Sequence, residues 1–519
     1  MQQVEKWGVF EIALNGRSDG NPFTDYSITG TFTNGADNVT VSGFYDGDGV
    51  YKVRFMPQKE GSYHYQISGS FGDGADGEFT VTAPKAGNHG MVHVANKFHF
   101  AYADGKKYFP LGTTCYAFTH QKDEVIAETF ASLKESAFNK IRFCIFPKHY
   151  DYNFAEPRSY PYVGTPVDSS NIGKDNFWNY IIGDKAGNDW DFSRFNPEHF
   201  QHIEKCIVKL MEMGIEADII LMHPYDRWGF STMTQEEDER YFKYVLARFG
   251  AYRNVWWSLS NEFDLIFNKT EDDWENLARV VVENDPYKHL RSIHSCMRFY
   301  DYNREWITHA SIQRQEMYRT AELTDEWREK WQKPVVLDEI GYEGNVQYGW
   351  GNLSGEEMLR RFWEGAVRGG YPGHGETYLH ESNLLWWSHG GKLRGESWKR
   401  IGFLLKIMEE TPGHGWRLKG QSENFTIPGT APNDVEWDDI CAVPEDEELA
   451  ERTGWHLYYY SFMQPSFRDY YLDDENEYKV EVIDTWNMTI TDAGIHKGKF
   501  SIKLPGRPYM AIRMAKANS

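Results

Sequence analysis

The chain has 519 residues, more than the roughly 100 to 200 of a typical domain, which predicts two to four structural units. Its 77 acidic residues outnumber its 55 basic residues and give a formal net charge of −22. Such a field repels phosphate backbones and anionic lipids, so we expect no nucleic acid partner and no membrane partner. The 19 tryptophans and 32 tyrosines offer flat faces that suit sugar rings, although an aromatic-rich core explains them equally well.

No apolar run reaches the roughly 18 residues that a membrane helix needs. The start, Met1 to Trp7, lacks the charged and then apolar pattern of a secretory signal. We therefore expect a cytoplasmic protein, or a secreted one if a signal peptide was removed. The five cysteines (115, 144, 206, 296 and 441) have no C-x-x-C spacing and are expected to be reduced core residues.

The first segment, residues 1–85, alternates short apolar runs with turn clusters about every ten residues. Runs such as 7–13, 39–45 and 61–67 show a period of two, which predicts an antiparallel β-sandwich. The Asp46-Gly-Asp-Gly49 cluster lies between two such runs without the further ligands of a calcium loop, so we interpret it as a hairpin turn.

Residues 86–412 show a different pattern, in which apolar strand-like runs alternate with capped helix-like runs. Strands are predicted near 109–115, 139–146, 215–222, 254–260, 289–295, 309–314, 334–339 and 373–379. Helices are predicted near 122–136, 197–213, 235–249, 271–285, 355–368 and 396–410, with capping boxes at Thr234–Glu237 and Ser354–Glu357. We expect an irregular stretch at 147–195. Eight strand–helix units without a Gly-rich dinucleotide turn favour a (β/α)8 barrel.

Polar groups end two of the predicted barrel strands. The run Asn254–Asp264 ends in Asn261, Glu262 and Asp264, and the run Lys333–Glu343 contains Asp338 and Glu339. Chemistry in such barrels collects at the carboxyl ends of the strands, and a pair of carboxylates is the minimum for glycoside hydrolysis. We therefore predict Glu262 and Glu339 as the catalytic pair.

Residues 413–519 return to strand-like runs near 455–460, 478–483, 498–503 and 509–513, which predict a second sandwich. The acidic run Glu445–Glu448 is interpreted as a solvated loop. The whole chain is thus predicted to be an α/β TIM barrel flanked by two all-β sandwich domains, with boundaries at 1–85, 86–412 and 413–519.

Four motifs resemble one known family when they are taken in order along the predicted strands: His223–Phe230, Trp256–Asp264, Asp338–Glu343, and His374–Tyr378 with Leu385–Trp387. They resemble the apiosidase-like, putative-cellulase family within the large clan of retaining (β/α)8 glycosidases. That resemblance implies an N-terminal immunoglobulin-like domain and a C-terminal sandwich. It also implies Glu262 as acid/base on strand 4 and Glu339 as nucleophile on strand 7.

The roles of the other site residues follow from this pattern. Arg142 would hold the nucleophile ionised, as the resemblance implies, or would form a structural ion pair within the barrel. Asn261 is a candidate ligand for the hydroxyl beside the reacting carbon. The remaining predicted substrate contacts are His223, Asp226, Arg227, His374, Glu376, Tyr378, Trp386 and Trp387, with one tryptophan as the sugar platform.

Several of these assignments leave alternatives open. His223 could equally be a satisfied structural group, and Asp264 only an orienting or loop-fixing residue. By strand alternation Asp338 should point to the opposite side of the strand from Glu339 and so out of the barrel, but with a different register it would inherit the role of Glu339.

The predicted function is a retaining, exo-acting glycoside hydrolase that cleaves a terminal β-linked sugar from plant-type oligosaccharides or glycosides. The stretches 147–195 and 379–395 would close one end of the site. The alternatives are a non-catalytic carbohydrate-binding protein and an endo-acting, cellulase-like hydrolase. No cofactor is expected, and the absence of H-E-x-x-H spacing gives no support for a metal.

Overall fold

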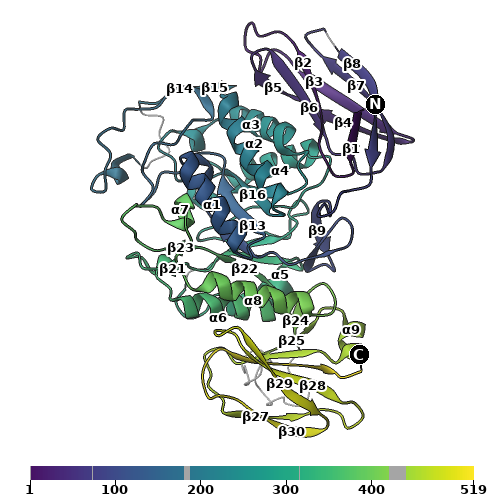
Figure 1. Cartoon of the computed structure of the whole chain (residues 1–519). Helices are drawn as coiled ribbons and strands as arrows, with labels where there is room; N and C mark the ends of the chain where they lie inside the picture. The colour runs from purple at the N-terminus through teal and green to yellow at the C-terminus, as the bar shows by residue number, and fades with distance from the viewer. Residues whose placement is uncertain (1, 73, 181–186, 315, 420–439, 519) are drawn as a thin grey trace.

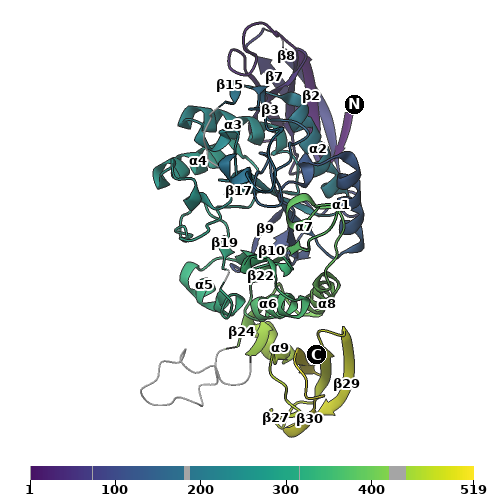
Figure 2. The same ribbon diagram turned by 90° about the vertical axis from the view of Figure 1, so that its left-hand side faces the viewer.

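The computed structural model describes residues 2–72, 74–180, 187–314, 316–419 and 440–518. A central barrel carries one β-rich region at each end (Figure 1). Figure 2, turned by 90°, shows the same order, with the N-terminal strands at one end of the barrel and the C-terminal strands at the other. This arrangement confirms the predicted fold class.

Two sheets form the N-terminal region. Their orders are β1-β8-β7-β3-β4 and β2-β6-β5. The strands are β1 (Gln2–Glu5), β2 (Phe10–Asn15), β3 (Ile28–Asn34), β4 (Asp37–Ser42), β5 (Phe44–Gly47), β6 (Val50–Phe55), β7 (Gly61–Gly69) and β8 (Gly74–Thr82). Alternate side chains of both sheets, among them Phe10, Phe32 and Val53, meet in one core, as the period of two predicts. Within the Asp46–Gly49 cluster, Asp46 and Gly47 end β5, and Asp48 and Gly49 form the hairpin turn to β6.

The barrel is an eight-stranded parallel sheet in the order β18-β17-β16-β13-β12-β22-β20-β19. Its strands are β12 (Gly112–Thr114), β13 (Lys140–Cys144), β16 (Glu216–Met222), β17 (Val255–Ser260), β18 (Arg291–Ser292), β19 (Ala310–Gln313), β20 (Val335–Glu339) and β22 (Tyr371–His374). A parallel bridge from His294 to Ser311 brings the two edge strands together and nearly closes the ring. All eight strands therefore present their carboxyl ends on one face.

Helices surround the barrel. They are α1 (Asp123–Glu135), α2 (Pro197–Glu212), α3 (Gln235–Phe249), α4 (Glu271–Asn284), α5 (Thr324–Trp331), α6 (Gly355–Val367), α7 (Trp386–His389) and α8 (Ser397–Glu410). Capping boxes open α3 at Thr234 and α4 at Thr270, and the Ser354 hydroxyl caps α6.

Three details of the predicted barrel were wrong. Residues 293–309, all of which the structure describes, form no helix, so the fifth strand–helix unit is incomplete. The last strand is β22 at Tyr371–His374 rather than 373–379, because the chain leaves the barrel there and β23 (Glu376–Thr377) pairs with β21 (Glu343–Gly344). The stretch 147–195 is not wholly irregular, since β14 (Tyr162–Thr165) and β15 (Asp189–Phe195) form a hairpin and residues 177–180 a 3-10 turn.

A small sheet that the sequence did not predict covers the amino ends of the barrel strands. It consists of β9 (Val92–Ala95), β10 (His99–Tyr102) and β11 (Lys107–Tyr108). The fully buried Phe100 packs against Trp256 at 5.3 Å and Tyr371 at 5.4 Å between ring centroids. This end is therefore filled with side chains, and only the opposite face is open to a ligand.

The C-terminal region has a six-stranded sheet, β24-β25-β26-β31-β28-β29, and the pair β27-β30. Its elements are β24 (Trp416–Leu418), β25 (Ile440–Pro444), α9 (Glu447–Thr453), β26 (His456–Tyr459), β27 (Phe467–Tyr471), β28 (Tyr478–Asp484), β29 (Thr489–His496), β30 (Lys499–Lys503) and β31 (Met510–Lys516).

Glu445–Glu448 is not the solvated loop that its charge predicted. Glu445 forms an ion pair with Arg328 at 2.5 Å and a hydrogen bond with His99 Nε2 at 2.8 Å, and the Asp446 side chain caps α9. All five cysteines are free thiols and four are buried, as expected of core residues. Among the described residues, no helix is both long and apolar enough to cross a membrane.

Candidate active site

Glu262 and Glu339 lie at the carboxyl ends of β17 and β20 and line one cavity of about 250 Å³. Aromatic and polar side chains make up the rest of its wall: Tyr116, Lys148, Tyr150, Tyr225, Leu265, Cys296, Gln313, Tyr342, Trp350 and Trp387. The two carboxylates come together because the strands run in parallel and end at the same face. Both are nearly buried, each with 5 % of its surface exposed.

Glu262 is held in an unusual backbone conformation. Its φ of 44° lies in the left-handed region, which is energetically unfavourable for a residue other than glycine. This conformation breaks the extended backbone at the end of β17 and changes the direction of the side chain. The carboxylate accepts hydrogen bonds from the Tyr225 hydroxyl, from Gln313 Nε2 at 3.0 Å and from Asn261 Nδ2 at 3.3 Å. Burial, reinforced by the negative charge of Glu339, raises the pKa of Glu262. This carboxyl group is therefore arranged to keep a proton.

Glu339 has the opposite electrostatic environment. Burial by itself would raise its pKa, but hydrogen bonding and charge from His294, the charge of Arg142 and the Tyr116 hydroxyl outweigh burial and lower the pKa. His294 Nε2 lies 3.3 Å and Arg142 Nη1 lies 3.6 Å from Glu339 Oε1, to which Tyr116 donates its hydroxyl. Glu339 is therefore held ionised.

One network links the two carboxylates. Arg142 Nη1 donates to Asn261 Oδ1 at 2.8 Å, while Asn261 Nδ2 lies on Glu262. His294 Nε2 lies 2.9 Å from Gln313 Oε1, whose amide donates to Glu262. The pKa values of the two carboxyl groups are thus shifted in opposite directions, upward for Glu262 and downward for Glu339, as an acid and a nucleophile require.

Asp338 does not point away from the barrel, contrary to the expectation from strand alternation. Its carboxylate reaches Lys140 Nζ on β13 at 3.1 Å and Ser311 Oγ on β19, so it lies inside the barrel. Alternation fails at the end of this strand because the pairing of β19 with β20 shifts register between Ser311 and Gln313. Asp338 is engaged by Lys140 below the cavity and does not line it.

Asp264 fixes a loop and lies outside the cavity wall. Its carboxylate accepts the backbone N–H groups of Cys296 at 2.7 Å, Met297 at 2.7 Å and Arg298 at 2.8 Å. It therefore positions the segment after β18, in agreement with the weaker of the two interpretations that the sequence allowed.

The motif after β16 is mostly structural. Both ring nitrogens of His223 face backbone groups, Phe146 O at 3.2 Å and Tyr225 N at 3.1 Å. Asp226 accepts the N–H groups of Trp228 at 2.6 Å and Ser231 at 2.7 Å, and Arg227 pairs with Glu156. None of His223, Asp226 and Arg227 lines the cavity, and the two backbone partners of His223 agree with its alternative interpretation as a satisfied structural group. The residue of this motif that reaches the cavity is Tyr225.

Of the two adjacent tryptophans, only Trp387 lines the cavity. Trp386 points into the core and donates its indole N–H to Thr113 Oγ1 at 2.8 Å, so Trp387 is left as the candidate for the single sugar platform. The Trp387 ring lies 5.0 Å from that of Trp350 and 6.4 Å from that of Tyr342. These rings form an aromatic wall, which suits the apolar face of a sugar.

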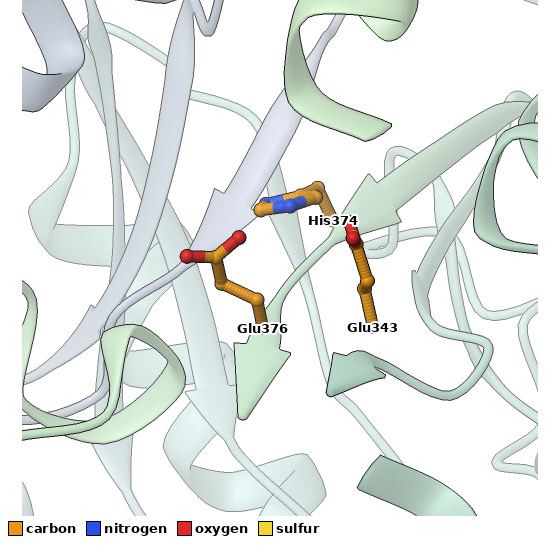
Figure 3. Close-up of side chains that lie close together, drawn as sticks. All are labelled: Glu343, His374 and Glu376. Carbon is orange, nitrogen blue, oxygen red and sulfur yellow. The ribbon is translucent and has the colours of Figure 1, made fainter. Parts of the chain in front are cut away.

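His374, Glu376 and Tyr378, which were predicted as substrate contacts, do not line the cavity either. Figure 3 shows His374, Glu376 and Glu343 converging on one another. Glu376 accepts the N–H groups of Arg394 and of Gly395, the latter at 2.8 Å. Glu343 accepts from Glu396 N at 2.7 Å, Ser397 N at 3.0 Å and the Tyr378 hydroxyl at 3.0 Å.

The same three side chains are close enough to hold a metal, since their ligand atoms lie within 4.8 Å of one another and His374 Nε2 has no hydrogen-bond partner among the described residues. The carboxylate oxygens, however, are already occupied by N–H and O–H donors. They also lie at the start of α8, where the helix dipole attracts anions and repels cations. The group fits an anchor for residues 394–397 better than it fits a cation site.

The sequence prediction missed Tyr116, Lys148, Tyr225, His294 and Gln313. Each follows or ends a barrel strand, namely β12, β13, β16, β18 and β19. Their shared signal was a polar side chain within a few residues of the carboxyl end of a predicted strand. This signal is weak in one sequence because many such residues only fix loops, as Asp226 and Asp264 do.

Residues 94–412 match the family model described as "Apiosidase-like, catalytic domain". Residues 3–70 and 437–515 match two domains of unknown function, DUF5060 and DUF5605. No curated protein matches the chain significantly.

Among solved structures, a candidate glycoside hydrolase from Bacteroides vulgatus ATCC 8482 is 38% identical over 100% of both chains, with a TM-score of 0.88. A family 5 glycoside hydrolase from the same organism is 16% identical over 83% of this chain and 94% of its own, with a TM-score of 0.59. The second likeness, at this low identity, is one of fold. Together with the family match, the first identifies the chain as a glycoside hydrolase with a carbohydrate substrate.

Proposed function

The chain belongs to the apiosidase-like family of glycoside hydrolases, and from that membership we propose that it is a retaining enzyme in which Glu339 is the nucleophile and Glu262 the acid/base. Glu339 attacks the anomeric carbon while Glu262 donates its proton to the departing glycosidic oxygen, forming a covalent glycosyl enzyme. Glu262, now ionised, then takes a proton from water, which attacks the anomeric carbon and releases Glu339.

The contrast between the environments of the two carboxyl groups is the observation that carries this proposal. A nucleophile must be ionised, and Glu339 faces Arg142 and His294. A general acid must hold its proton at the working pH, and the pKa of buried Glu262 is raised. A site that only binds sugar does not need two carboxyl groups with oppositely shifted pKa values. This contrast favours an enzyme over a non-catalytic carbohydrate-binding protein.

The size and walls of the cavity favour exo action. A volume of about 250 Å³ is below the roughly 300 to 1,000 Å³ of sites that take drug-sized ligands, so it suits a terminal sugar unit rather than a chain. Tyr150 from the insertion after β13, and Trp387 from the segment after β22, stand in its wall. We propose that these walls block one end of the substrate and restrict cleavage to terminal residues.

The experiment uses a panel of aryl β-glycosides, pyranosides and furanosides, with wild type, Glu339→Ala and Glu262→Ala. Added azide should rescue both variants but give products of opposite configuration. Glu339→Ala should yield the glycosyl azide of inverted configuration, because azide replaces the nucleophile. Glu262→Ala should yield the retained azide, because azide then attacks the covalent intermediate.

The exposed Glu381→Gln variant provides a matched control and should hydrolyse the panel like wild type. Unchanged hydrolysis by Glu339→Ala would exclude Glu339 as nucleophile, and an inverted sugar product from wild type would exclude retention.

A further inference from the structure

Lys148 is a cation of the cavity that the proposed mechanism leaves without a role. It follows β13, has 4 % of its surface exposed and lines the cavity beside both carboxylates. Its ammonium lies over four aromatic rings, 3.7 Å from the centroid of Tyr116, 4.5 Å from Tyr225, 4.6 Å from Trp387 and 5.4 Å from Tyr150. Attraction to the faces of these rings offsets part of the cost of burying the charge.

The neighbouring cations already have partners, but Lys148 does not. Arg142 lies 3.6 Å from Glu339, and Lys140 pairs with Asp338 and Asp218 below the cavity. Across the described ranges, no carboxylate forms an ion pair with Lys148, and no side chain or carbonyl accepts a hydrogen bond from it. A buried ammonium has three donors, and leaving them unpaired is costly unless a ligand supplies the acceptor.

The rings under Lys148 place it at the subsite where the bond is cleaved. Tyr116 donates its hydroxyl to Glu339, and Tyr225 donates its hydroxyl to Glu262. Lys148 therefore lies over the side chains that hold the nucleophile and the acid. A sugar whose anomeric carbon sits between these carboxylates must bring another part of its ring close to Lys148.

We propose that Lys148 binds a carboxylate on this sugar unit, so that the enzyme removes uronic acid residues rather than neutral sugars. The proposal rests on the glycosidase function proposed above and assigns its substrate class. An ammonium–carboxylate pair at this largely buried lysine forms a charge-assisted hydrogen bond, which is stronger than a bond to a neutral hydroxyl. Arg142 is the cation that lies nearest to Glu339, at 3.6 Å, and among the described residues neither carboxylate forms an ion pair with Lys148, so its ammonium is available to an acidic ligand.

Lys148 carries this charge at neutral pH. Burial lowers its pKa to about 8, with the nearby Cys144, Glu262 and Glu339 opposing the shift. A neutral sugar would leave the ammonium without a charged partner. A C6 carboxylate would form an ion pair with it and so replace the hydration that burial removes.

The first test measures binding and does not depend on turnover. Glucuronate and galacturonate are titrated by calorimetry against glucose and galactose, with wild type, Lys148→Met and Lys148→Arg. We expect at least one acid to bind wild type at least tenfold more tightly than its neutral partner. Lys148→Met should abolish this preference, and Lys148→Arg should keep part of it. Acids that bind no tighter than neutral sugars would overturn the proposal.

The second test compares kcat/KM for aryl uronides and the matching neutral glycosides. The uronide-to-glycoside ratio should fall by about 10- to 100-fold in Lys148→Met and stay at the wild-type value in Lys122→Met, an exposed lysine at the start of α1. A ratio that Lys148→Met leaves unchanged would contradict the proposal. Efficient hydrolysis of neutral glycosides alone would refute the uronide assignment while leaving the glycosidase function intact.

Discussion

Glu262 has a strained backbone conformation, is buried, and accepts hydrogen bonds from three donors. The surrounding contacts offset the energy of this conformation, which directs the carboxyl group into the cavity rather than along β17. Its raised pKa has a kinetic consequence. An acid that must be protonated loses activity as the pH rises through its pKa, so burial extends the active range upward.

Glu262→Gln should therefore lower kcat/KM for alkyl glycosides by about 100- to 10,000-fold. Aryl glycosides with strongly acidic leaving groups need less protonation of the departing oxygen. The rate of their glycosylation step should therefore decrease much less. The alkaline limb of the kcat/KM profile should disappear because the titrating acid is gone. Steady-state kinetics from pH 4 to 9 measures both effects, and an alkaline limb that persists in the variant would exclude Glu262 as the acid.

Tyr225 provides a finer test of the same pKa. Its hydroxyl donates to the ionised form of Glu262 and lowers the pKa against the effect of burial. Tyr225→Phe should move the alkaline limb of kcat/KM to higher pH by roughly 1 unit. The control is Tyr318→Phe, because Tyr318 is 86% exposed. A limb that moves to lower pH would contradict the assignment of this hydrogen bond.

At the scale of elements, the segment after β22 depends on the anchor formed by Glu343 and Glu376, which accept the N–H groups of residues 394–397. Gly395 passes so close that a Cβ there would lie 2.4 Å from Glu376 Oε2, which requires a glycine. The anchor holds residues 394–397 at the start of α8, and Trp387 belongs to the same connection between β22 and α8. Residues predicted as substrate ligands thus serve the site by fixing a loop that carries part of its wall.

This anchor predicts a pH-dependent stability. Burial, with the charge of Glu343, raises the pKa of Glu376 to about 8, above its unfolded value of roughly 4.3. A raised folded pKa means that the stabilisation is complete below the unfolded pKa and is lost as the pH rises through the folded one. The free energy of unfolding should therefore decline between pH 5 and 8, by roughly 1 to 4 kcal/mol from this group.

Glu376→Gln cannot ionise and should flatten that decline. Thermal midpoints of wild type, Glu376→Gln and the exposed control Glu381→Gln, measured at pH 5 and pH 8, provide the comparison. The difference between the two pH values should shrink in Glu376→Gln alone. An unchanged difference would mean that Glu376 is ionised at both pH values.

For the whole molecule, a buried charge cluster joins the N-terminal sheets to the barrel. Arg54 on β6 pairs with Glu204 on α2 at 2.7 Å and donates to the Arg248 carbonyl at 2.7 Å. Arg248 in turn pairs with Asp46 at 2.7 Å. The two regions are therefore fixed by groups that would be costly to leave unpaired.

Arg54→Ala should destabilise this interface by about 1 to 3 kcal/mol, because Glu204 keeps only Arg248 at 3.0 Å and the Arg248 carbonyl loses its donor. We expect faster limited proteolysis near residues 83–91, between the two regions, and little change in kcat/KM for the aryl glycosides. Arg17→Ala is the control, because the Arg17–Asp19 pair is exposed. Equal proteolysis of the two variants would show that the cluster does not hold the regions together.

The sequence by itself determined the layer order of the molecule and the catalytic candidates. Period-two alternation predicted the flanking sheets, and capped helices between apolar strands predicted the barrel, because these signals are local. Glu262 and Glu339 were predicted because a carboxylate at the end of an apolar, strand-like run can be recognised from the sequence alone.

Only the tertiary structure decided which other side chains meet these carboxylates. Tyr116 and His294 reach Glu339 from strands far apart in sequence, and Lys148 finds its aromatic cage only when separate loops converge. His374 and Glu376 showed the reverse, since His374 bonds to Thr113 on β12 and Glu376 accepts from a loop, and neither lines the cavity. The physical reason is that the sequence of a strand determines that its side chains alternate between two faces. It does not determine which face lies inside the barrel after a register shift, nor where the following loop lies.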